Sequence, residues 1–150
     1  MQIRMTANQA LRLRPKDVNR VYNLPVGGEK IVLDKDDKTG VAEFKDSLGI
    51  GDDTDKWMVP HKSVRTALLN EDDAVKWSKL AILYILGTLL APSTSPHISV
   101  IYHSVLDDID QVANYDWCDH VLQHIKTGIG KKGVKSPKTD FHFLLVYIFY

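Results

Sequence analysis

The uninterrupted apolar run Leu80–Leu86 limits most strictly what this chain can fold into. It lies between Asn70 and Pro92, which are predicted to cap and to end one helix. The acidic residues at 71–73 suit the first turn, where the helix dipole is positive. A helix that is apolar on all sides is surrounded by other elements or lies in a membrane. The run from Leu80 to Ala91, with Thr88 inside it, is only about 18 Å long, against roughly 30 Å of hydrocarbon, so the sequence predicts a buried central helix over about 71–91.

The predicted fold class is mainly α, a small helical bundle around this central helix. The 150 residues suit a single domain that is long enough to bury a core. Apolar spacing predicts further helices over residues 16–22, 41–48, 59–69, 98–106 and 117–128. Residues 10–13 and 31–33 are predicted to be short extended segments near the N-terminus. The predicted core residues are Trp77, Leu80, Leu83, Leu86, Trp117 and Leu122.

The end of the sequence, FHFLLVYIFY, is strongly apolar and has no polar tail. It is predicted to form a last helix that Asp140 caps. Many large apolar side chains at a free terminus would favour association or aggregation. The expectation is therefore that residues 1–150 are a fragment of a larger domain, truncated at the C-terminus.

Composition excludes several classes of protein. Lysine plus arginine and aspartate plus glutamate number 19 each, so the net charge of zero does not indicate a nucleic-acid binder. The single cysteine, Cys118, excludes a disulfide within the chain and favours a reducing, intracellular compartment. The first residues contain no apolar segment of a secretory signal. No membrane association and no cofactor is predicted.

The residue types in Cys118, His120 and His124 could bind a metal. The two histidines lie four apart on a predicted helix, a spacing at which they can share an ion. A zincin would have glutamate directly after the first histidine, where this chain has Val121. Cys118 also lies about 160° around the helix from His120. The sequence therefore predicts surface histidines, a buried thiol and no metal.

Two other acidic patterns contain side chains of the types that bind metal ions. Asp107, Asp108 and Asp110 could bind a divalent metal, but they follow an apolar helical segment and are interpreted as a solvated end. The acidic loops at 34–40 and 51–55 lack the EF-hand spacing. No catalytic residue is predicted, since no serine or cysteine lies in a nucleophile motif.

Two glycine-containing segments could contact phosphates. VGGEK at 26–30 lacks both the Walker and the dinucleotide-binding pattern and is predicted to be a turn. The segment 127–139 is interpreted as a solvated linker, although its lysines stay candidates for phosphate contacts. These lysines are Lys131, Lys132, Lys135 and Lys138.

Three segments together carry a family resemblance: RPKDVNRVYNLPVGGEKI, LAILYILGTLLAPST, and Tyr115–Cys118 (YDWC) at the start of a helix. In this order they resemble the transposon-derived plant mobile domain, often labelled "aminotransferase-like", over roughly residues 13–150. The residues that form the structural pattern are Leu24, Pro25, Gly27, Gly28, Trp77, Gly87, Trp117 and Cys118. Asn23 stands where that family usually has glycine, and asparagine tolerates the left-handed conformation that such a turn needs.

The resemblance implies a helical, non-enzymatic domain of mobile-element origin that is nuclear in some members. The first hypothesis for function is a protein-interaction or scaffolding module with an unknown protein partner. The second is the N-terminal accessory region of a Ulp1-type cysteine protease, whose catalytic residues would lie beyond Tyr150. The third is a nucleic-acid-binding remnant of a transposase that uses the four lysines of the linker.

Overall fold

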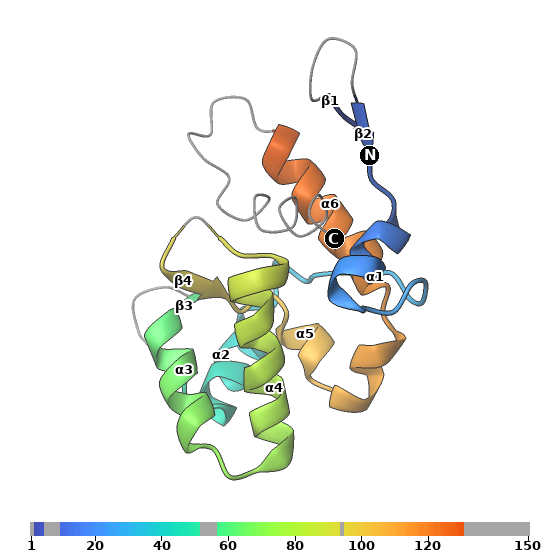
Figure 1. The fold of residues 1–150 in the computed structure, drawn as a ribbon. Helices are drawn as coiled ribbons and strands as arrows, with labels where there is room; N and C mark the ends of the chain where they lie inside the picture. The colour runs from blue at the N-terminus through green and yellow to red at the C-terminus, as the bar shows by residue number, and fades with distance from the viewer. Residues whose placement is uncertain (1, 5–9, 52–56, 94, 131–150) are drawn as a thin grey trace. The chain divides into compact units, whose positions relative to one another are not determined.

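The computed structural model describes residues 2–4, 10–51, 57–93 and 95–130, and it confirms a mainly helical fold (Figure 1). The chain divides into two compact units. Unit 1 consists of Met1–Ile31 and Asn114–Tyr150, and unit 2 consists of Val32–Ala113. The two ends of the sequence therefore belong to one unit, and the middle of the sequence forms the other.

Unit 1 contains a hairpin and two helices. Strands β1 (Gln2–Arg4) and β2 (Ala10–Arg12) pair antiparallel, in agreement with the extended segment predicted near the N-terminus. Helix α1 (Pro15–Tyr22) packs against α6 (Trp117–Gly130). The buried apolar side chains of this unit include Leu13, Val18, Trp117, Val121 and Ile125. Both helices lie close to their predicted ranges.

Both ends of α1 have a local cause in the sequence. Pro15 occupies the first turn, where its missing N–H leaves no donor unsatisfied. The carboxylate of Asp17 accepts a hydrogen bond of 2.8 Å from the backbone N–H of Arg14. At the other end Asn23 has φ 54° and ψ 30°, so the predicted left-handed conformation is confirmed.

Unit 2 contains most of the helices. In chain order these are α2 (Lys38–Ser47), α3 (His61–Asn70), α4 (Ala74–Ile85), the π-helical turn η1 (Leu86–Leu90), α5 (His103–Leu106) and the 3-10 helix η2 (Ile109–Asn114), which reaches the unit boundary. Strands β3 (Met58–Pro60) and β4 (His97–Ser99) pair antiparallel, with Val59 opposite Ile98. Both of these central residues are buried.

The central helix is present, but its start and its surroundings differ from the prediction. Asp73, and not Asn70, is the N-cap, because its side chain accepts a hydrogen bond from the N–H of Lys76. Asn70 instead ends α3. The buried face of α4 and η1 consists of Leu80, Leu83, Leu86 and Leu90.

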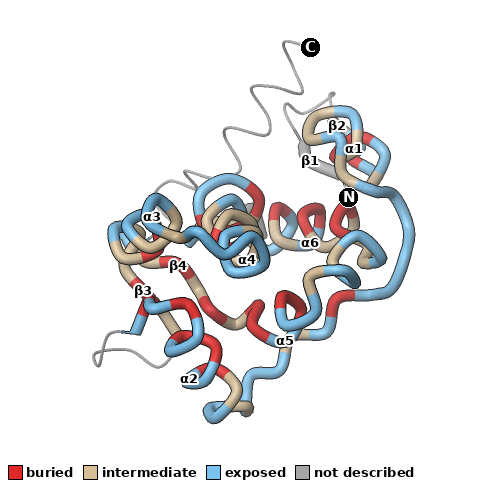
Figure 2. The backbone as a smooth tube through the Cα atoms, turned by 90° about the horizontal axis from the view of Figure 1, so that it is seen from below, coloured by how far each residue is buried: buried red, intermediate tan, exposed pale blue. Residues whose placement is uncertain are grey.

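The expectation that the run Leu80–Leu86 is buried on all sides, and that Trp77 belongs to the core, is wrong. Trp77 is 49% exposed, Ile85 45% and Leu89 42%. Figure 2 shows that buried and exposed segments both occur along α4. When a helix has apolar residues on every side, any of its sides could be buried. The neighbouring elements then determine which side is covered.

The helix predicted over 98–106 is also corrected. Ile98 lies in β4, and only His103–Leu106 is α-helical. Ile98 and Val100 are buried, while Ser99 and Ile101 on either side of Val100 are partly exposed, so the burial alternates as in a strand. β4 also contacts η1, where the buried Gly87 lies directly against the side chain of Ile98. A Cβ on Gly87 would lie 2.5 Å from Cγ1 of Ile98.

Candidate functional site

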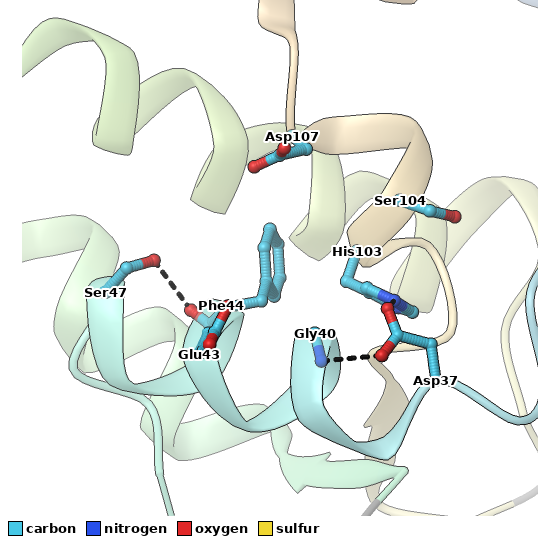
Figure 3. Close-up of a pocket in the computed structure, with 8 residues that line it drawn as sticks. All are labelled: Asp37, Gly40, Glu43, Phe44, Ser47, His103, Ser104 and Asp107. Carbon is cyan, nitrogen blue, oxygen red and sulfur yellow. Dashed lines mark hydrogen bonds and ion pairs between the residues drawn. The ribbon is translucent and has the colours of Figure 1, made fainter.

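A pocket of about 470 Å³ lies between α2 and α5 in unit 2 (Figure 3). Asp37 caps α2 by accepting a hydrogen bond of 2.8 Å from the N–H of Gly40. A Cβ on residue 40 would collide with the Asp37 carboxylate, so glycine leaves the space that this carboxylate fills. The other residues that line the pocket are Glu43, Phe44, Ser47, His103, Ser104 and Asp107.

His103 is the buried polar residue of this pocket. Its Nε2 lies 3.2 Å from Oδ2 of Asp37, and its ring meets Phe44 edge-on with centroids 6.5 Å apart. The Gly40 N–H, and next the His103 ring, hold the pKa of Asp37 below its usual value. Nδ1 of His103 is buried and has no hydrogen-bond partner among the described residues.

The Asp37–His103 pair therefore joins the start of α2 to α5. A catalytic pair of this kind would act on a nucleophile through its second ring nitrogen. Here the nearby Ser47 hydroxyl donates instead to the carbonyl of Phe44, at 2.9 Å. The pair explains how two helices far apart in sequence are held together, and it was missed at the sequence level because 66 residues separate its members.

In unit 1 the predicted turn at Leu24–Gly28 meets the start of α6. The N–H of Glu29 donates to the carbonyl of Asn114, and the N–H of Asp116 donates to the carbonyl of Glu29, both at 2.8 Å. Gly28 has φ 120°, and its Cα lies so close to Asn114 that a Cβ would collide with the carbonyl oxygen there. Two of the segments behind the family resemblance are thus in direct contact.

Cys118 adds a further contact between these segments. Its thiol lies 3.3 Å from the carbonyl oxygen of Leu24, to which it donates a hydrogen bond, and the side-chain amide of Asn19 donates to the same oxygen. Burial, with a smaller contribution from Asp116, raises the pKa of the thiol to about 11. The predicted buried thiol is confirmed, and its raised pKa keeps it protonated at neutral pH.

The two histidines considered as metal ligands, His120 and His124, lie on α6. The ring of His120 packs edge-on against Trp117 with centroids 6.1 Å apart. Within the described ranges, no group of three or more His, Cys, Asp or Glu side chains could hold a metal ion. The four lysines proposed for phosphate contacts, Lys131, Lys132, Lys135 and Lys138, lie outside the described residues.

Burial, and next the neighbouring His124, lowers the pKa of His120 below 6.5. The unfolded chain then binds more protons than the folded chain between the two pKa values. Stability is therefore expected to fall as the pH drops through 6.5 towards the folded pKa, and to level off above 6.5. Urea unfolding of the parent and of His120→Gln between pH 5 and 8 checks this. The variant should have the flatter pH profile, and an unchanged slope would contradict the assignment to His120.

An apolar strip follows the exposed side of α4 and η1. Trp77, Ala81, Ile85 and Leu89 recur every four residues, so they share one side of the helix, and we call them the α4 face. Ala81 is partly exposed, and the three larger side chains are between 42% and 49% exposed. A row of exposed large apolar side chains along one side of a helix is typical of interaction surfaces.

The net charge of zero is the sum of opposite net charges on the two units. Unit 1 contains eleven lysines and arginines against five aspartates and glutamates, a net charge of +6. Unit 2 contains eight against fourteen, a net charge of −6. The low whole-chain charge thus says little about what either unit attracts.

Fold and surfaces define a mainly helical domain with an acidic, apolar-faced unit and a basic unit. The chain belongs to a family described as a domain of unknown function (DUF8566), whose family model matches residues 1–140. No curated protein and no solved structure matches the chain. Within the described ranges, no helix is long and apolar enough to cross a membrane.

Proposed function

We propose that this domain acts by binding and not by catalysis, and that the α4 face of unit 2 holds a basic amphipathic helix of a partner protein. The observation that carries the proposal is the exposure of Trp77, Ile85 and Leu89 on one side of α4. A helix laid against such a strip buries side chains at intervals of three or four residues. Exposed tryptophan is among the residues that contribute most to binding energy.

Charge decides which partner fits. Unit 2 has a net charge of −6, and the residues just before α4 are Glu71, Asp72 and Asp73. A second copy that paired through its own α4 face would bring another acidic unit to this face, and like charges oppose that pairing. A helix with lysines or arginines beside its apolar strip would be attracted instead. The occupant proposed is therefore a basic amphipathic helix.

The probe that tests this is an 18-residue amphipathic peptide of leucine and lysine, titrated into the full chain by calorimetry. Trp77→Ala is expected to weaken its binding about 30-fold, which corresponds to about 2 kcal/mol for the loss of a central aromatic anchor. Val32→Ala is the matched control, because Val32 is 75% exposed in the same unit but belongs to neither α4 nor η1. This control should bind within about twofold of the parent.

Two results would overturn the proposal. The first is equal binding of a leucine and glutamate peptide of the same length, because charge would then not select the partner. The second is self-association of the parent chain that Trp77→Ala abolishes, because a second copy would then occupy the α4 face. Sedimentation without peptide measures the second.

Relation to the plant mobile domain, and with it a nuclear location, is a further part of the proposal. It rests on the resemblance of three segments, two of which meet in this chain where the Leu24–Gly28 turn contacts the start of α6. An experimental structure of a plant mobile domain provides the test, since the same backbone pairing should occur there.

A further inference from the structure

The positive charge of unit 1 is displayed on its surface. Its described cationic side chains are all exposed: Arg12, Arg14, Lys16, Arg20, Lys30 and Lys126. Among the described residues, the Lys79–Asp107 ion pair and the Asp37–His103 hydrogen-bonded pair both lie in unit 2. The cations of unit 1 that the structure describes are therefore available to an external anion.

The described acidic side chains of unit 1 are less exposed than its cationic side chains. Asp17 is buried and accepts a hydrogen bond from the N–H of Arg14. Asp116 accepts one of 2.9 Å from the N–H of Asp119 at the start of α6. Among the described acids of unit 1 only Glu29 is exposed, against six exposed cations, so cationic side chains dominate the described surface of this unit.

The spacing of the cations suits a repeating anion. Lys16 and Arg20 lie four residues apart on α1 and so point to the same side, about 6 Å apart at their bases. Arg12 and Arg14 precede the helix and are two residues apart. Arginine binds phosphate with two parallel hydrogen bonds, which makes it the residue best suited to a phosphate backbone.

From these observations we propose that unit 1 binds nucleic acid through the phosphate backbone, independently of base sequence, with Lys16 and Arg20 at the centre of the contact. Twelve of the fourteen carboxylates of a second copy's unit 2 are divided in sequence among separate runs at 34–37, 52–55, 71–73 and 107–110. The phosphates of DNA follow one another about every 3.4 Å on each strand. They therefore match closely spaced cations better than these separated carboxylates do.

This proposal is independent of the one for the α4 face, because it involves other residues in the other unit. It is tested with the full chain and a fluorescently labelled 20-base-pair DNA of mixed sequence, by anisotropy between 50 and 200 mM salt. If about five phosphates are neutralised, affinity should fall about 500-fold over this range. Lys16→Glu with Arg20→Glu should weaken binding about tenfold or more at 50 mM and reduce the salt slope by about 2.

The matched control reverses two exposed cations of unit 2, Lys62→Glu with Arg65→Glu on α3. Both pairs change the net charge of the chain by the same amount, so only the location differs. The control should bind DNA within about threefold of the parent. Equal weakening by both pairs, or no binding to the parent at 50 mM salt, would overturn the proposal. Salt-sensitive self-association that both pairs remove would also overturn it, because the anion would then be a second copy.

Discussion

Gly28→Ala is expected to lower the free energy of unfolding by about 3 kcal/mol. The residue has φ 120°, a conformation that costs a side chain about 1–3 kcal/mol. The new Cβ would also collide with the carbonyl oxygen of Asn114 and lie 3.1 Å from the carbonyl carbon of Tyr115. These are backbone atoms, so the turn must move away from α6 and lose the hydrogen bonds of Glu29.

The neighbouring glycine supplies the control. Gly27 also has a positive φ, 81°, but no atom lies within 4 Å of the Cβ that a substitution would add. Gly27→Ala should therefore show the conformational strain alone, about 1–2 kcal/mol. Urea unfolding followed by circular dichroism compares the two. Equal losses would mean that the close approach of the turn to the start of α6 contributes nothing to stability.

Gly87→Ala is the second substitution with a large expected effect, a loss of about 2 kcal/mol from overpacking. Its Cβ would lie 2.5 Å, 2.6 Å and 3.0 Å from three atoms of the Ile98 side chain. Both residues are buried, and Ile98 is held in β4 by its pairing with β3. The clash therefore cannot be relieved by turning an exposed side chain away.

A double-mutant cycle separates this clash from a general effect of alanine in the π-helical turn. Ile98→Ala removes the two γ-carbons that a Cβ on residue 87 would meet. Gly87→Ala should therefore cost much less in the Ile98→Ala background than in the parent, with a coupling of about 1 kcal/mol or more. Additive losses would show that η1 and β4 do not pack as described.

The elements that the sequence predicted well have their determinants close by in the chain. Pro15 and Asn23 delimit α1, and Asp116 caps α6 through the N–H of Asp119. The elements that it missed depend on distant partners. β4 exists because His97–Ser99 pairs with Met58–Pro60, and a short apolar segment read alone does not distinguish a strand from a helix.

Dependence on residues that are distant in the chain also limits what the sequence indicates about function. Trp77 is apolar, and only the placement of the neighbouring elements leaves it exposed. The separation of charge is hidden in the sequence because unit 1 is assembled from both ends of the chain. Whole-chain charge argued against nucleic acid, whereas the charge of unit 1 argues for it.

The central claim is that the α4 face binds a basic amphipathic helix, and the emission of Trp77 during the peptide titration tests it most directly. The difference between the spectra of the parent and of Trp77→Phe isolates this residue from Trp57 and Trp117. Because Trp77 is 49% exposed, its emission should shift to the blue as the peptide covers it, and the shift should saturate at one peptide per chain. Binding detected by calorimetry without any change in Trp77 emission would contradict the account.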